Sequence, residues 1–140
     1  MSYSPQNIRN ICLLGHGGNG KTTLVESFLY LTGGSDRMGR TSEGNTVCDY
    51  DPEEIKRQIS ISAAVAPVEY NGCKINVLDT PGNFDFAGEV SECLSVADAG
   101  ILVCAAKGGL SVGTERAWKY LSERKMPRIL YISKMDEDNV

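Results

Sequence analysis

A glycine-rich stretch, GHGGNGKTTL at residues 15–24, constrains the fold of this chain more than any other feature. The apolar run before it, Ile8 to Leu14, predicts a short buried strand because a polar start and a glycine bound it. The helical spacing of apolar residues after it predicts a helix from Lys21 to Leu31, ended by two glycines. The local order is therefore strand, glycine turn, helix.

The stretch fits the pattern G-x-x-x-x-G-K-[ST], which is typical of loops that bind phosphate chains. Small residues let backbone N–H groups converge on phosphate oxygens, the helix N-terminus adds positive potential, and a lysine neutralises charge. An ordinary glycine-rich turn is the alternative, but the flanking strand and helix favour a nucleotide site. The predicted nucleotide-binding residues here are His16, Gly17, Gly18, Asn19, Gly20, Lys21, Thr22 and Thr23, and the Thr22 hydroxyl is also predicted to bind Mg²⁺.

The rest of the chain alternates between strand and helix patterns. Asn71 and Gly72 are a strong signal for a hairpin, so the strands on either side should pair antiparallel. The remaining strands need helical crossovers, which predicts an α/β domain over 1–140 with a mostly parallel sheet, helices on both faces and ligands at the carboxyl ends of the strands. The expected strands are Ile59–Tyr70, Cys73–Leu78, Gly100–Ala105 and Arg128–Ile132, and the expected helices are Gly88–Val96 and Thr114–Lys125.

Composition limits the class of protein. With 140 residues, 41% of them apolar, the chain can form one domain with a core, and its net charge of −4 gives no general affinity for nucleic acid. Five cysteines without a C-x-x-C pair favour a reducing, cytoplasmic environment, and no apolar run predicts a membrane span. The polar connection 33–57 is long, so we expect it to be functional and mobile. The predicted core strand residues are Cys12, Leu14, Val77, Leu78, Leu102, Val103, Leu130 and Ile132.

Two more motifs lie at predicted strand ends. DTPG begins at Asp79, an acid placed to hold Mg²⁺ opposite the glycine loop, and the N–H of Gly82 can reach a γ-phosphate. SKMD ends at Asp136, which can accept hydrogen bonds from guanine, while the stem of Lys134 packs along the loop or the base. Each tetrapeptide alone fits a plain turn or a charged strand exit. The three motifs in this order favour a GTPase over a kinase or an ATPase.

Four stretches, GHGGNGKTTL, EGNTVCDYDPEEIKRQISI, VLDTPGNFDF and SKMDEDN, resemble the G domain of translational GTPases of the elongation factor G type and its paralogues. The resemblance implies a Ras-like P-loop fold, GTP or GDP with Mg²⁺ as cofactors, GTP hydrolysis, and action on the ribosome through a full-length factor. It also implies that the long polar connection is the first switch, in which Ser60 would coordinate Mg²⁺ in the GTP state. With Thr22 and Asp79, Ser60 completes the predicted metal set.

The chain departs from the family pattern at positions that affect catalysis. Gln58 stands where the family has glycine, so the backbone there is expected to be less free to take a positive φ. Asn83 stands where the family has a histidine that places the attacking water, and an amide cannot hold a proton. The predicted catalytic residues are therefore Lys21, Gly82 and Asn83, with slow intrinsic hydrolysis. His16 is expected to serve loop structure and not catalysis.

Further departures concern binding. Gly18 replaces an aspartate associated with a monovalent cation, and Ser133 replaces an asparagine amide that ties the base loop to the phosphate loop, so guanine selection would rely on Asp136. The sequence ends four residues after Asp136, so we expect a fragment whose open sheet edge favours self-association. A hydrolysis-impaired regulatory paralogue and a ribosomal-protection or release-factor relative remain alternative functions.

Overall fold

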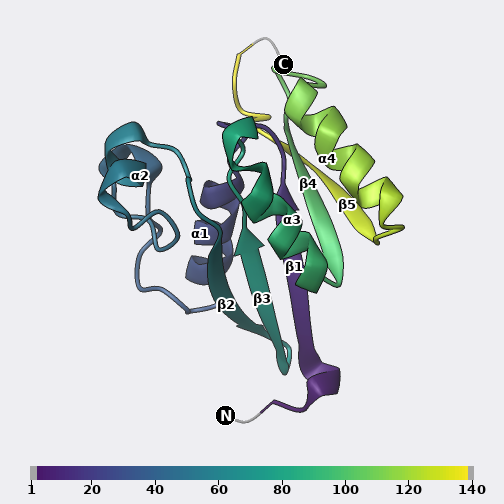
Figure 1. Cartoon of the computed structure of the whole chain (residues 1–140). Helices are drawn as coiled ribbons and strands as arrows, with labels where there is room; N and C mark the ends of the chain where they lie inside the picture. Colours follow the sequence, from purple (N-terminus) through teal and green to yellow (C-terminus); the bar gives the residue numbers. More distant parts are fainter. Residues whose placement is uncertain (1–2, 139–140) are drawn as a thin grey trace.

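The computed structural model describes residues 3–138 and contains one five-stranded sheet in the order β2-β3-β1-β4-β5 (Figure 1). Only the β2–β3 pair is antiparallel, so the predicted mostly parallel α/β sheet is confirmed. The strands are β1 (Ile8–Leu14), β2 (Ala64–Tyr70), β3 (Cys73–Asp79), β4 (Ala99–Ala105) and β5 (Arg128–Ser133). The helices are α1 (Lys21–Leu31), α2 (Pro52–Arg57), α3 (Ala87–Val96) and α4 (Val112–Glu123), with short 3-10 turns η1 (Pro5–Asn7), η2 (Thr41–Glu43) and η3 (Phe84–Phe86).

The helices cover the two faces of the sheet, as Figure 1 shows with α3 and α4 on the side opposite α1. Successive residues of the central strand β1 point to opposite faces, so Cys12 and Leu13 belong to two different cores. Cys12 packs with residues of α3 and α4, whereas Leu13 packs with residues of α1. Burial on both faces fixes β1 in the middle of the sheet, and with it the glycine-rich loop that follows.

The predicted hairpin is present between β2 and β3. Tyr70 pairs with Cys73, which leaves Asn71 and Gly72 as a two-residue turn. Both turn residues have positive φ, 48° and 76°, as the tight turn favoured by right-twisted strands requires.

The predicted strand Ile59–Tyr70 is too long, because β2 begins only at Ala64. The apolar alternation of Ile59 and Ile61 resembles a strand, but the backbone N–H groups of this segment donate elsewhere. The N–H of Ile61 donates to a Glu54 carboxylate oxygen, and the N–H of Ala63 donates to that of Glu89. These side-chain acceptors hold the segment out of the sheet.

The prediction that Leu130 and Ile132 are core residues is wrong, since their exposed fractions are 56% and 43%. The strand β5 pairs only with β4 and forms an edge of the sheet among the described residues. Helix α4 packs chiefly on β4, so it leaves both faces of β5 accessible.

Helix α2 is an element that the sequence analysis does not predict. Asp51 and Glu54 form a reciprocal capping box at its start, and Pro52 occupies the first turn. The letters DPEE carry this signal, although the helix is short and most of its residues are exposed. In Figure 1 it projects from the connection between α1 and β2.

Candidate functional site

The glycine-rich loop runs from the end of β1 to the start of α1. Gly15 lies so close to β4 that a Cβ atom would overlap the carbonyl oxygen of Val103. Gly20 caps the helix in a left-handed conformation, with φ of 87°. The chain therefore turns tightly against the sheet and directs the first N–H groups of α1 towards the loop.

Lys21 folds back over the loop that precedes it. Its Nζ donates to the carbonyl oxygens of Gly15 at 3.0 Å and His16 at 3.1 Å, and the side chain is 5% exposed. Burial lowers the pKa of this ammonium group, and the charge of Asp79 opposes that shift. The lysine is a buried cation fixed at the mouth of the loop.

Two side chains tie the loop to the end of the sheet. The Asn19 amide donates to the Val103 carbonyl oxygen at 3.0 Å, so its side chain anchors the loop. The Ser133 hydroxyl donates to the Asn19 carbonyl oxygen at 2.7 Å. The expectation that serine at position 133 removes the tie between the base loop and the phosphate loop is therefore wrong, because a hydroxyl makes it.

The residues predicted to bind the metal meet at one corner of the loop. The Thr22 hydroxyl donates to Asp79 Oδ2 at 2.7 Å and lies 3.2 Å from the Ser60 hydroxyl. Asp79 is 1% exposed, and among the described residues its Oδ1 has no hydrogen-bond partner. Burial, the largest cause, raises the pKa of Asp79 to about 6. The corner thus gathers two hydroxyls and one carboxylate, and one oxygen of that carboxylate has no hydrogen-bond partner within residues 3–138.

The chain after β3 passes very close to the glycine-rich loop. A Cβ atom on Gly82 would lie 2.6 Å from Lys21 Nζ and would overlap the backbone nitrogen of Gly17. Thr80 secures this crossing, because its hydroxyl donates to the Leu13 carbonyl oxygen. Only glycine fits at position 82, and its backbone lies beside the buried lysine.

Asn83 caps the 3-10 turn η3, because its side-chain oxygen accepts the N–H of Asp85 at 3.4 Å. The same turn carries Phe84, whose ring centroid lies 6.0 Å from that of His16. His16 thus packs against the segment after β3, and the Asn83 amide has a local structural partner.

Two buried glutamates not predicted from the sequence organise the connection between α1 and β2, and a third buried carboxylate, Asp49, lies within it. Glu26, fully buried, accepts the N–H groups of Gly39 at 3.0 Å and Val47 at 2.6 Å. Glu54 binds backbone N–H groups in the other half of the connection. Asp49 is 6% exposed and lines the cavity, and burial is the largest cause that raises its pKa. The hints in the sequence are an acid within an apolar helical stretch, at Glu26, and the capping pattern DPEE, which contains Glu54.

Gln58 takes a left-handed conformation at the end of α2, with φ of 55°. The side chain does not prevent the positive φ, and the expectation that this backbone is less free than with glycine stays a prediction. The residue adopts the positive φ that the family's glycine would adopt freely, at a cost of about 1–2 kcal/mol for an L-residue.

These segments enclose a cavity of about 480 Å³. It brings together the glycine-rich loop, the polar connection and the segment after β3, and Lys134 lines it from the end of β5. Asn19, Asp79 and Ser133 do not line it, and Asp136 is exposed outside it. The predicted site residues that line the cavity are His16, Gly17, Gly18, Gly20, Lys21, Thr22, Thr23, Ser60, Gly82, Asn83 and Lys134.

A glycine loop between a central strand and a helix, with an acid at the end of the neighbouring strand, defines a P-loop nucleotide-binding domain. The chain belongs to the family described as the elongation factor Tu GTP binding domain, whose model matches residues 6–139. The predicted membership of the translational GTPases is thereby confirmed.

Relatives by sequence support the same family. The chain is 42% identical over 130 residues to elongation factor G 2 of Borreliella burgdorferi, covering 93% of this chain and 19% of that protein. It is 40% identical over 137 residues to the mitochondrial ribosome-releasing factor 2 of Debaryomyces hansenii, covering 98% and 16%. The chain thus spans less than a fifth of the length of these relatives.

Solved structures share the fold. A crystal structure of a protein from Thermus thermophilus has a TM-score of 0.89 and 43% sequence identity, covering 92% of this chain and 20% of the other. A bacterial selenocysteine-specific elongation factor has a TM-score of 0.76 and 25% identity, covering 99% and 21%. The described residues therefore correspond to about a fifth of each of these longer chains.

Proposed function

We propose that the cavity binds GTP and GDP through the glycine-rich loop and that the domain hydrolyses GTP to GDP and phosphate. The observation that carries this proposal is the convergence of Lys21, Gly82 and Lys134 on one cavity of about 480 Å³ at the carboxyl ends of the strands. The loop amides and Lys21 would hold the phosphates. Asp136 would select guanine, and Ser133 would keep the base loop joined to the phosphate loop.

Mg²⁺ fits the corner formed by Thr22, Ser60 and Asp79. The donors are two hydroxyls and a carboxylate, which are the oxygen ligands that this cation prefers. The carboxylate of buried Asp79, whose Oδ1 has no partner in the described part of the chain, supplies the negative charge that such a site needs. When bound there, Mg²⁺ would neutralise charge on the β- and γ-phosphate oxygens.

In hydrolysis, a water attacks the γ-phosphorus, the bond to the bridging oxygen of GDP breaks, and a proton of the water passes to the released phosphate. Lys21 would stabilise the charge that develops on the phosphate oxygens, and the N–H of Gly82 would orient the γ-phosphate. Asn83 would hydrogen-bond the attacking water without accepting its proton. Its side-chain oxygen already accepts the N–H of Asp85, so this water is less firmly held.

Single-turnover GTP hydrolysis, with and without ribosomes, tests this proposal. An Asn83→His variant should hydrolyse GTP faster, by roughly a hundredfold if an imidazole contribution is restored. Asn83→Ala is the matched control, and it should hydrolyse no faster than the wild type. An unchanged rate in Asn83→His would contradict the role of Asn83, and no hydrolysis by any variant would contradict the GTPase function.

For the full-length factor in which residues 1–140 would form part of the nucleotide-binding domain, we propose action on the ribosome. This is supported by the names of its relatives, an elongation factor and a ribosome-releasing factor. Those names include mitochondrial proteins, so a cytoplasmic location stays a prediction. None of the helices within residues 3–138 is long and apolar enough to cross a bilayer. Self-association through the exposed strand β5 also stays a prediction.

A further inference from the structure

The segment from Asp51 to Ser62 is closed on itself by one buried carboxylate. Glu54 lies in the exposed helix α2, yet it is only 2% exposed. One of its oxygens, Oε2, accepts the N–H of Asp51 at 3.1 Å. The other, Oε1, accepts the N–H groups of Ile61 at 2.9 Å and Ser62 at 3.0 Å. A single side chain thus binds amides on both sides of the helix.

Helix capping accounts for only one of these three hydrogen bonds. The bond from Asp51 completes the capping box and needs only Oε2. The two bonds to Oε1 come from beyond the helix, after Gln58 has reversed the chain in its left-handed conformation. The backbone of Glu54 also binds the residues after Gln58, because its carbonyl oxygen accepts the N–H of Ile59 at 3.2 Å.

Ser60 lies between the residues that Glu54 holds. The backbone N–H of Ile59, before it, donates to the Glu54 carbonyl oxygen, and the backbone N–H of Ile61, after it, donates to the Glu54 carboxylate. With its neighbours fixed, the Ser60 hydroxyl is placed 3.2 Å from the Thr22 hydroxyl, which is itself bonded to Asp79. Charge-assisted hydrogen bonds to backbone N–H groups are strong enough to fix such a position.

We propose that Glu54 is a positioning residue that sets Ser60 at the cation corner and so determines the contribution of Mg²⁺ to GTP binding. This inference rests on the proposed nucleotide and metal site. Glu54 does not line the cavity, so it acts through Ser60 and not by contact with the nucleotide.

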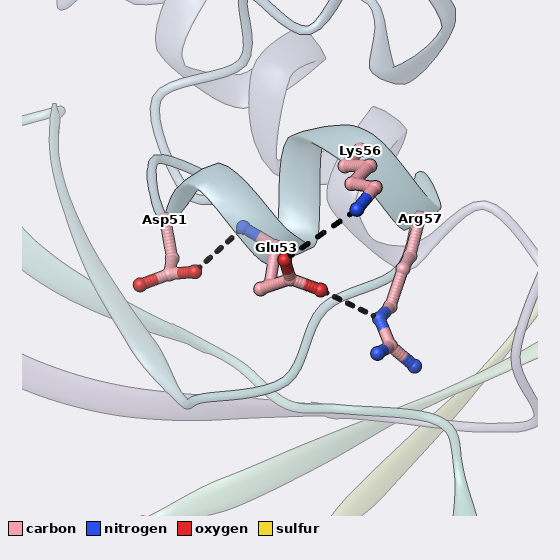
Figure 2. A network of polar contacts seen from close by, with 4 residues as sticks. All are labelled: Asp51, Glu53, Lys56 and Arg57. Carbon is pink, nitrogen blue, oxygen red and sulfur yellow. Dashed lines mark hydrogen bonds and ion pairs between the residues drawn. The ribbon is translucent and has the colours of Figure 1, made fainter.

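The neighbouring residue Glu53, drawn with its polar contacts in Figure 2, provides a matched control. Its carboxylate faces solvent and pairs with Lys56 at 3.9 Å and Arg57 at 3.0 Å within the same helix. Asp51 provides a second control, because its side chain accepts the N–H of Glu53 at 2.8 Å and caps α2 without touching Ile61 or Ser62. Glu53→Gln therefore removes a charge from α2, and Asp51→Ala weakens the helix cap.

The experiment measures the affinity of a non-hydrolysable GTP analogue with saturating Mg²⁺ and with a chelator. Glu54→Gln should weaken the affinity in Mg²⁺ about tenfold, because a neutral amide cannot satisfy all three N–H groups, and should leave the affinity in chelator nearly unchanged. Glu53→Gln and Asp51→Ala should change either affinity by less than about threefold. In a Ser60→Ala background, Glu54→Gln should add no further loss.

Amide hydrogen exchange of the ligand-free chain supplies a readout that needs no nucleotide. The N–H groups of Ile61 and Ser62 should exchange faster in Glu54→Gln than in Glu53→Gln. The inference is overturned if Glu54→Gln binds like Glu53→Gln, if Asp51→Ala produces the same loss, or if the losses from Glu54→Gln and Ser60→Ala are additive. Absence of any Mg²⁺-dependent binding by the wild type would overturn the proposed function and this inference with it.

Discussion

Two segments border the cavity, and they are held in different ways. The glycine-rich loop at residues 15–22 is fixed by the strand and helix that flank it and by backbone contact with the next loop. The connection between α1 and β2 is held by two buried glutamates, Glu26 from α1 and Glu54 from α2. The first segment is part of the sheet framework. The second depends on a few hydrogen bonds to these two carboxylates.

We expect the largest loss of nucleotide binding from a substitution in the glycine-rich loop. Lys21→Ala should weaken GTP and GDP binding by about 4 kcal/mol, roughly a thousandfold, because a buried cation at the phosphate site is lost. Lys119→Ala, which removes an exposed lysine of α4, is the control and should bind normally. Equilibrium titration measures both variants, and equal affinities would contradict the assigned role of the loop.

Removal of a glutamate that holds the connection between α1 and β2 should also lower the stability of the protein substantially. Glu26→Ala leaves the N–H groups of Gly39 and Val47 without their acceptor, and we expect a loss of about 3 kcal/mol in the free energy of unfolding. Glu43→Gln changes an exposed acid of the same connection, with an expected loss below about 0.5 kcal/mol. Urea denaturation compares the two. If Glu26→Ala is as stable as Glu43→Gln, the connection is not held in this way.

A smaller effect is expected at the link between the loop and the end of the sheet. Ser133→Ala removes the hydrogen bond to the Asn19 carbonyl oxygen and should lower the free energy of unfolding by about 1 kcal/mol. Ser95→Ala, whose hydroxyl bonds within its own helix, is the control. Asparagine at position 133 should restore most of the loss. A neutral Ser133→Ala variant would show that the hydroxyl does not carry the link.

The smallest effect concerns backbone conformation. Gln58→Gly relieves the cost of a side chain at φ of 55°, but glycine gains entropy in the unfolded chain, so the net gain in stability should be below about 1 kcal/mol. Gln58→Ala keeps a Cβ atom and should show no gain. Thermal unfolding of the two variants separates conformational strain from side-chain contacts, and a less stable Gln58→Gly would contradict the strain.

The sequence is most informative where local signals determine the structure. The strand Ile8–Leu14 and the helix Lys21–Leu31 are predicted with the observed bounds, because glycines mark their ends and apolar residues define their faces. Two residues of the metal corner can also be predicted from the sequence, since Thr22 and Asp79 follow from motif spacing and strand order. The short helix α2 is missed, although its capping box is visible in DPEE.

Long-range acceptors explain the remaining errors. The strand predicted from Ile59 begins later because carboxylates of Glu54 and Glu89 take the N–H groups of Ile61, Ser62 and Ala63. Burial of Glu26 likewise depends on a loop whose path is set by tertiary contacts. The apolar pattern alone predicts that Leu130 is a core residue. Its burial would need a helix over β5, but α4 packs chiefly on β4.

Isothermal titration of the chain with GTP, GDP and ATP, each with and without Mg²⁺, is the direct test of a guanine-nucleotide site with a metal corner. GTP and GDP should bind, Mg²⁺ should strengthen the binding of GTP, and ATP should bind far more weakly because Asp136 selects guanine. Equal or tighter binding of ATP, or no binding of any of the three nucleotides, would contradict such a site.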